Sequence, residues 1–321
     1  MARQDVKRVV VRDGAIVVGG RVQVTFQRTL RIPDDGRSYP LPPGLGTLPV
    51  LAASEAGTRV PAGWRRPGTF LVPMYQREAL WLGFANDWPP VAITVTVGGV
   101  NAVSGRTGHE GLHADPQDYV VCPDQMWLDG VNAGPATVRQ FVAMPLGEGY
   151  SVEAAVTGEE RRGGLEITVF PPRRGARLTR PAPSGGPMKM ATPRMGLGAG
   201  GRIVQKIYPD PHGVSVWDTG RATRLSVHLV NSLAYRALTG REPPPTPIGA
   251  KTYSERGYPW FSLYEEDLGD VAAPGVLGTV KTIAERDRER GRTAEDEGFE
   301  VDPSRITPLT RRRGGPPCPK E

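Results

Sequence analysis

The sequence predicts a mainly β fold, either a sandwich or a distorted barrel, followed by a small α/β C-terminal appendage and a charged tail. Many short segments alternate apolar and polar residues with a period of two, which is the pattern of a strand with one buried face. Turn residues separate these segments, and the chain has 41 glycines and 33 prolines among its 321 residues. Many short strands with turns between them favour a sandwich or a barrel.

The first strands are expected in the N-terminal third. Residues 6–11 and 15–18 flank Asp13-Gly14, a dipeptide typical of a tight hairpin. Residues 22–27 alternate regularly, and 91–97 (VAITVTV) give the strongest strand pattern in the chain. Residues 70–84 are expected to be mainly β, because their aromatic and aliphatic side chains suit strands. A short strand is expected at 119–122, whereas Trp127 is placed in a loop.

A β-hairpin is predicted between residues 151 and 170. Val152, Ala154 and Val156 alternate with more polar residues, and Leu165 to Val169 do the same. The polar stretch TGEERRGG between them has the composition of a turn. Pro171 and Pro172 should end the hairpin, because proline donates no hydrogen bond to a sheet.

The chain divides into four predicted parts. Residues 1–172 form a β-rich domain, and 173–197 form a basic linker rich in proline, glycine and arginine. Residues 198–268 contain a returning strand and a small α/β appendage, in which a helix near 231–238 ends at Gly240. Residues 269–321 are a charged, partly disordered tail, with a solvated, fraying helix expected over 281–297.

Positive charge is concentrated in one segment. The chain has a net charge of +6, yet residues 171–206 contain eight basic residues and no Asp or Glu. Such a segment attracts polyanions through forces that salt weakens. The candidate partner-binding residues are Arg173, Arg174, Arg177, Arg180, Lys189 and Arg194. The alternative is a solubilising linker without a partner, since charge runs are often only solvated.

Residues His109 to His113 spell H-E-x-x-H, the zinc motif of metalloproteases. The motif works on a helix, where both imidazoles lie on one face and the glutamate acts as base. Here glycines and Asp115-Pro116 surround it, so no amphipathic helix can be drawn through it. His109, Glu110 and His113 therefore remain an alternative metal set only, and no metal or other cofactor is predicted.

Two further motifs lack the context that they need. Gly196 to Gly201 spells G-x-G-x-x-G, but a dinucleotide site requires a strand before it and a helix after it. Here a proline-rich segment precedes it and a strand follows, so a flexible linker is the preferred interpretation. Cys122 lies at an apolar strand end, where a cysteine is usually a small buried hydrophobe rather than a nucleophile.

The compartment predicted from the sequence is the cytoplasm. The chain has two cysteines, Cys122 and Cys318, and the second lies in a Gly/Pro-rich tail, so a structural disulfide is not expected. The N-terminal residues are charged and contain no apolar core of a signal peptide. No apolar run reaches the length of a membrane span.

Several stretches resemble a family of uncharacterised bacterial and fungal proteins. They include TFQRTLRIPDDGRSYPLPPGLG (25–46), FLVPMYQREALWLGF (70–84), DPQDYVVCPDQMWLDG (115–130) and RQFVAMPLGEGYSVEAAVTGEERRGGLEI (139–167). The stretches MGLGAGGRIVQKIYPDPHGVSVWD (195–218) and PWFSLYEED (259–267) continue it. The resemblance implies that 196–218 belong to the folded unit. It implies no activity, cofactor or catalytic residue, and the loop of His109 and His113 is outside it.

The function predicted from these observations is a non-enzymatic cytoplasmic binding or scaffold protein whose basic segment contacts an anionic partner, either an acidic protein or nucleic acid. One alternative is an enzyme with a pocket in the β domain, for which a metal-dependent hydrolase is the first type to consider. Its candidate polar residues are Gln76, Arg77, Glu78, Asp118, Asp124 and Asp129. Another alternative is a homo-oligomer or a subunit of a larger assembly.

Overall fold

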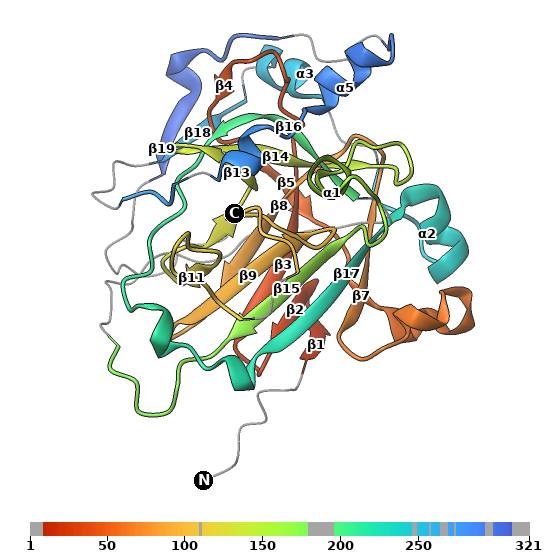
Figure 1. Cartoon of the computed structure of the whole chain (residues 1–321). Coiled ribbons are helices and arrows are strands. Elements are labelled where there is room, and N and C mark those ends of the chain that lie inside the picture. Colours follow the sequence, from red (N-terminus) through yellow and green to blue (C-terminus); the bar gives the residue numbers. More distant parts are fainter. Residues whose placement is uncertain are drawn as a thin grey trace, which may run out of the picture.

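Two mixed, open β-sheets form the body of the protein, which confirms the predicted mainly β fold (Figure 1). This computed structural model describes residues 9–108, 111–178, 196–245, 249–256, 258–263, 269–272, 274–292 and 298–309. One sheet has ten strands and the other has seven, and a separate two-stranded sheet lies near the C-terminus. The two large sheets share a single large apolar core, so the arrangement is that of a sandwich.

The ten-stranded sheet has the order β1-β2-β3-β8-β14-β16-β4. In addition, β5 pairs with β3, β12 pairs with β8 and β13 pairs with β14. These strands are β1 (Val9–Arg12), β2 (Ala15–Val18), β3 (Val22–Thr29), β4 (Ser38–Tyr39), β5 (Gly44–Thr47), β8 (Ala79–Ala85), β12 (Trp127–Leu128), β13 (Gly130–Gly134), β14 (Thr137–Met144) and β16 (Gly196–Val204). The hairpin predicted at Asp13-Gly14 is present between β1 and β2, and both turn residues have positive φ. Trp127, predicted in a loop, lies instead in β12 and pairs with Gly83 of β8.

The seven-stranded sheet has the order β10-β9-β15-β17-β7-β6, and β11 pairs with β9. Its strands are β6 (Leu51–Ala52), β7 (Thr69–Met74), β9 (Val91–Val97), β10 (Val100–Asn101), β11 (Val120–Cys122), β15 (Leu165–Phe170) and β17 (Thr223–Asn231). The strands predicted within 70–84 and at 91–97 and 119–122 are thereby confirmed. Alternation along β9 sends Ile93, Val95 and Val97 into the shared core and leaves Thr94 and Thr96 on the other face.

The first half of the predicted 151–170 hairpin is wrong, because residues Val152–Thr157 form helix α1. The Ser151 side chain accepts a hydrogen bond from the Ala154 amide, and Gly158 ends the helix in the left-handed conformation. Glu153 of α1 is buried and accepts three backbone amides, from Arg161, Arg162 and Gly163. These caps stabilise a helix in a stretch whose apolar residues also alternate. Of the two predicted strands of the hairpin, only the second, β15, is therefore a strand.

The glycine-rich residues 196–201 are the start of strand β16 and not a linker. Gly200 lies where a Cβ would come within 2.6 Å of a methyl group of Val142, and at Gly201 it would collide with the carbonyl oxygen of Pro33. Glycine is needed here because neighbouring groups approach the backbone closely. Residues 196–204 therefore lie between β14 and β4 in the ten-stranded sheet.

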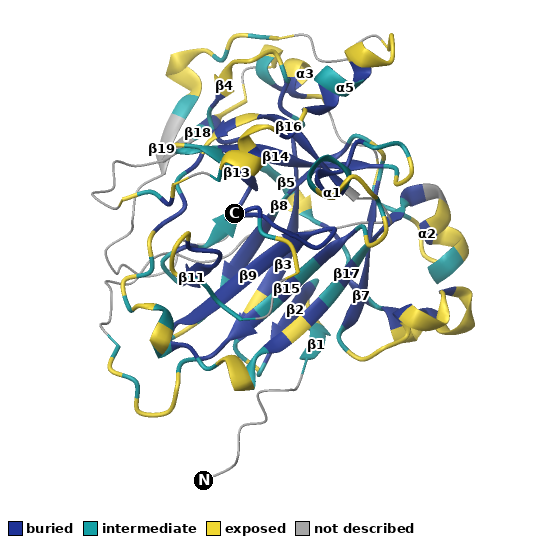
Figure 2. Cartoon of the chain, in the orientation of Figure 1, coloured by how far each residue is buried: buried dark blue, intermediate teal, exposed yellow. Residues whose placement is uncertain are grey.

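The remaining elements pack around the sheets, and the burial pattern shows the strands as the dark blue interior (Figure 2). They are α2 (Ser232–Thr239), α3 (Ala250–Glu255), α4 (Gly275–Gly278), α5 (Ile283–Glu289), β18 (Trp260–Leu263), β19 (Ile306–Leu309) and the 3-10 helices η1 (Ala53–Arg59), η2 (Ala62–Trp64), η3 (Val214–Val216), η4 (Thr219–Arg221) and η5 (Pro303–Arg305). Helix α2 ends at Gly240 with positive φ, as predicted. In the described part of the chain, no helix is long and apolar enough to cross a membrane.

Candidate functional site

A pocket of about 490 Å³ lies on the face of the seven-stranded sheet that points away from the shared core. We name it the threonine pocket. It is lined by Thr94, Thr96, Gly111, Glu166, Thr168, Phe170, Thr219, Ala222 and Arg224. Its volume lies in the range of small-molecule sites. Strands β9, β15 and β17, which run side by side in Figure 1, supply its floor.

Strand register places the floor residues in two rows. Thr168 of β15 lies opposite Thr94 of β9 on one side and opposite Arg224 of β17 on the other. One step along the same face, Glu166 lies opposite Thr96. Opposed residues of neighbouring strands have Cβ atoms roughly 5 Å apart, so these side chains are direct neighbours. The site therefore combines hydroxyl groups with one acidic and one basic side chain.

Hydrogen bonds join two loops whose residues pack against Phe170, one of the residues that line the pocket. The Asp210 carboxylate accepts a hydrogen bond from the Tyr119 hydroxyl at 2.7 Å and from the Trp217 indole at 2.8 Å. The Gln117 side chain donates to the carbonyl of Tyr208 at 3.1 Å. Phe170 packs with Tyr119 and Trp217 in a small apolar cluster. Two loops that are distant in sequence are thus fixed to each other beside the pocket.

Of the two histidines and the glutamate of the H-E-x-x-H motif, the structure describes His113, since His109 and Glu110 lie outside the described residues. The Nδ1 atom of His113 lies 2.6 Å from a carboxylate oxygen of Asp118, which is fully buried, and the His113 amide donates to the other oxygen. Asp118 thus fixes both the ring and the backbone of this loop. Among the described residues, no three His, Cys, Asp or Glu side chains are grouped as a metal site.

Three of the predicted partner-binding arginines are described, and all three are exposed. Arg173, Arg174 and Arg177, here named the arginine segment, follow directly after β15. The Arg173 amide donates to the carbonyl of Val216, and its Nε atom donates to the carbonyl of Ser215. The other three predicted residues, Arg180, Lys189 and Arg194, lie outside the described residues.

The six polar residues proposed for an enzymatic pocket do not line the threonine pocket. Gln76 is exposed, whereas Glu78 forms a buried ion pair with Arg28. Asp129 is buried, and Gln205 donates a hydrogen bond of 2.6 Å to its carboxylate. Burial raises the pKa of Asp129 to about 7. Arg77 contacts Asp287, and Asp118 contacts His113. Asp124 is the sixth candidate.

The structure also places the two remaining sequence candidates. Cys122 has no exposed surface, and its burial raises the pKa of its thiol to about 12. A thiol with so high a pKa is protonated at neutral pH and is a poor nucleophile. The G-x-G-x-x-G stretch forms β16 within a sheet and does not precede a helix.

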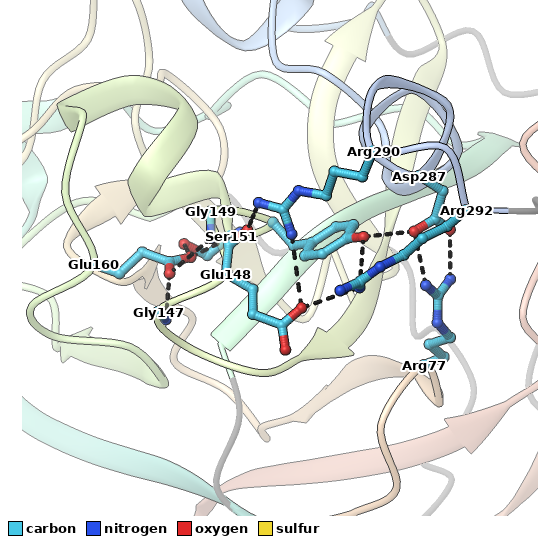
Figure 3. A network of polar contacts seen from close by, with 10 residues as sticks. Arg77, Gly147, Glu148, Gly149, Ser151, Glu160, Asp287, Arg290 and Arg292 are labelled. Carbon is cyan, nitrogen blue, oxygen red and sulfur yellow. Dashed lines mark hydrogen bonds and ion pairs between the residues drawn. The ribbon is translucent and has the colours of Figure 1, made fainter.

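A charged network holds helix α5 against the β body (Figure 3). Arg77, which has φ of 66°, makes two hydrogen bonds of 2.7 and 2.8 Å to the Asp287 carboxylate. The Tyr150 hydroxyl donates to the same carboxylate at 2.6 Å, and the Arg290 guanidinium lies 4.5 Å from the centre of the Tyr150 ring. Although burial acts in the opposite direction, the hydrogen bonds from Arg77 and Tyr150 hold the pKa of Asp287 below its ordinary value.

This network corrects the prediction of a solvated, fraying helix over 281–297. The side chains of Ile283 and Asp287 have no exposed surface, and Thr282 caps α5 through a reciprocal pair of bonds with Glu285. Asp287, Arg290 and Arg292 pair with groups on the β body, whereas Lys281 and Glu289 pair with each other at the surface. Residues 293–297 lie outside the described residues.

We expect the substitution Asp287→Ala to detach α5 and to lower the free energy of unfolding by about 2–3 kcal/mol, because it removes the carboxylate from a largely buried Arg77. Urea unfolding measures the loss, and limited proteolysis should show earlier cleavage within 281–292. The matched control is Glu289→Gln on the same helix, whose carboxylate pairs with Lys281 at the surface. The control should behave as the wild type. Equal stability of Asp287→Ala and wild type would show that the network does not hold α5.

The fold and the pocket define a two-sheet, mainly β protein with a polar site on the open face of its smaller sheet. In comparisons with known proteins, no family model, no curated protein and no solved structure matches the chain. The resemblance to uncharacterised bacterial and fungal proteins therefore stays a prediction.

The threonine pocket was not predicted from the sequence, although a signal for it was present. In VAITVTV, the second face of the strand consists of Ala92, Thr94 and Thr96, and in LEITVF it contains Glu166 and Thr168. Polar residues repeated on one face of two strong strands indicate a surface that is not simply a second core. The partner strand β17 and its Arg224 cannot be found in this way, because register is set by the fold.

Proposed function

We propose that this chain is a non-enzymatic binding protein that contacts an anionic partner through the arginine segment. The observation that supports this proposal is the exposure of Arg173, Arg174 and Arg177 within five residues. Among the described residues, none of the three forms an ion pair. Three exposed guanidinium groups that have no carboxylate partner among the described residues attract phosphate or carboxylate groups, to which arginine donates paired hydrogen bonds.

The start of this segment is held in place, which favours recognition over mere solvation. Pro172 bridges to Trp217, which has no exposed surface, and the Asp218 amide donates to the carbonyl of Pro171 at 2.8 Å. Together with the two bonds of Arg173, these contacts fix the backbone from which the arginines project. A pre-ordered cationic edge loses less conformational entropy when a partner binds.

Other parts of the predicted function have less support. An enzyme built on the six polar candidates is less well supported, because they do not line the threonine pocket. The cytoplasmic location, the scaffold role, homo-oligomerisation and membership of a larger assembly stay predictions.

We expect the triple variant Arg173→Glu/Arg174→Glu/Arg177→Glu to lose affinity for a fluorescein-labelled single-stranded oligonucleotide by tenfold or more at low salt. If each arginine contacts one phosphate, the slope of log K against log salt should become shallower by about 2, at roughly 0.7 for each contact. Fluorescence anisotropy at several salt concentrations measures both quantities. A labelled poly-glutamate peptide in parallel distinguishes an acidic protein partner from nucleic acid.

The matched control is Arg59→Glu/Arg65→Glu/Arg66→Glu, which changes the same charge on another exposed stretch. If the arginine segment is the contact, this control should keep most of the affinity and of the salt slope. Equal losses of affinity in both variants would show that net charge alone, and not the arginine segment, accounts for the binding. Wild-type protein that binds neither probe at low salt would refute the proposal.

A further inference from the structure

The threonine pocket is a second surface, and nothing in the proposed function uses it. Along β15 its face presents Glu166, Thr168 and Phe170 in that order, each about 7 Å from the next. Arg224 lies beside Thr168, and Ala222 lines the pocket as a small apolar group. The pocket thus offers an acidic group and an aromatic ring along β15, with a cationic group beside them on the neighbouring strand β17.

The two charged groups are available to a ligand. Glu166 is half-buried and Arg224 is exposed, and they occupy diagonal positions on neighbouring strands, roughly 7–8 Å apart at Cα. Within the described residues, neither forms an ion pair. A molecule that presents a cation to Glu166 and an anion to Arg224 would therefore satisfy both groups at once.

The floor contains a hydroxyl group that points to a ligand. Thr96 is 3% exposed, and within the described structure its Oγ1 atom has no hydrogen-bond partner. Buried hydroxyl groups are normally hydrogen-bonded, so one without a partner in a pocket indicates that a bound molecule completes it. Thr94 and Thr168 supply further hydroxyl groups on the same floor.

We propose that the threonine pocket binds a small zwitterion of the α-amino-acid type. The ammonium group contacts Glu166, the carboxylate contacts Arg224, and the threonine hydroxyls bond to both polar ends. The side chain of the ligand lies toward Phe170 and Ala222, which favours an apolar side chain. The lining residue Phe170 packs with Tyr119 and Trp217, which both donate hydrogen bonds to Asp210, so this side of the pocket needs little ordering on binding.

Isothermal titration calorimetry of the full chain with L-leucine and a panel of other L-amino acids tests the proposal. Saturable binding of L-leucine is expected. The affinity should be at least tenfold lower for N-acetyl-L-leucine, which lacks the ammonium group, and for L-leucinamide, which lacks the carboxylate. Absence of saturable binding for every amino acid up to about 10 mM would refute the proposal.

Single substitutions then assign the ends of the ligand. Glu166→Gln should lower the affinity for L-leucine at least tenfold and leave the affinity for N-acetyl-L-leucine unchanged. Arg224→Gln should lower the affinity for L-leucine and leave the affinity for L-leucinamide unchanged. Thr96→Val should lower the affinity for the amino acid while the midpoint of urea unfolding stays the same. The matched controls are Glu55→Gln and Arg65→Gln, both at exposed positions outside the pocket.

Unchanged leucine affinity in both Glu166→Gln and Arg224→Gln would place the amino acid elsewhere and overturn the assignment. The triple variant of the arginine segment should bind leucine as the wild type does. Leucine binding that survives in this variant, while oligonucleotide binding is lost, would show that the two surfaces are separate. The two proposals can therefore fail independently.

Discussion

Replacing Glu78 by Gln should lower the free energy of unfolding by about 3–5 kcal/mol, the largest loss expected from any single side chain discussed above. The side chains of Glu78 and Arg28 are 1% and 9% exposed, and one carboxylate oxygen of Glu78 accepts a hydrogen bond from Arg28. The other oxygen accepts the Tyr75 amide at 2.8 Å. The substitution leaves a buried guanidinium without its counter-ion, which is far more costly than losing a surface pair. Urea unfolding monitored by tryptophan fluorescence measures the change.

Two further variants test whether the uncompensated charge, and not a general disturbance of the structure around Glu78, causes the loss of stability. The double variant Arg28→Met/Glu78→Leu should recover most of the lost stability, because apolar side chains of similar size can replace a buried ion pair. Glu159→Gln, which breaks an exposed pair with Arg161, should leave stability unchanged. A double variant that is less stable than Glu78→Gln would show that the ion pair itself, rather than the uncompensated charge, determines the loss.

Asp129→Asn should remove a large pH dependence of stability. Burial raises the pKa of Asp129 in the folded protein to about 7, whereas the unfolded chain has an ordinary value near 4. Between these values the folded state binds the proton more tightly, so stability is full below about pH 4 and falls until about pH 7. A difference of about 3 pKa units corresponds to roughly 4 kcal/mol. The wild type should therefore lose up to this amount relative to the Asn variant between pH 4 and pH 8.

Urea unfolding of both proteins at intervals from pH 4 to pH 8 provides the measurement, since all other titrating groups cancel in the difference. The Asn amide can still contact the Gln205 side chain, which in the wild type bonds to both the carboxylate and the amide of Asp129. Glu55→Gln, at an exposed position, is the control and should track the wild type at every pH. Parallel curves for Asp129→Asn and wild type would mean that Asp129 titrates normally in the folded protein.

Local patterns determined the strands whose side chains alternate strongly. Residues 91–97 form a strand because Ile93, Val95 and Val97 all meet the shared core. Asp13-Gly14 gave its hairpin because both residues accept positive φ, which such a turn requires. In both cases the cause lies within a few residues, so the sequence is enough to reveal it.

Where two local patterns compete, packing decides between them. Residues 152–156 alternate like a strand but also follow a Ser cap and precede Gly158, and the helix is the state that lets the buried Glu153 accept three backbone amides. Residues 196–201 have low strand propensity, yet they form β16 because only glycine fits against Val142 and Pro33. Neither contact can be read from neighbouring residues.

The sequence by itself determined a mainly β protein with a concentration of positive charge after residue 171. Only the tertiary structure decided which polar residues lie together. Thr96, Glu166 and Arg224 come from three strands separated by long stretches of sequence, and they meet because hydrogen bonds between β9, β15 and β17 fix one register. A shift of one residue would turn these side chains into the core, and the burial of the opposite, apolar face prevents it.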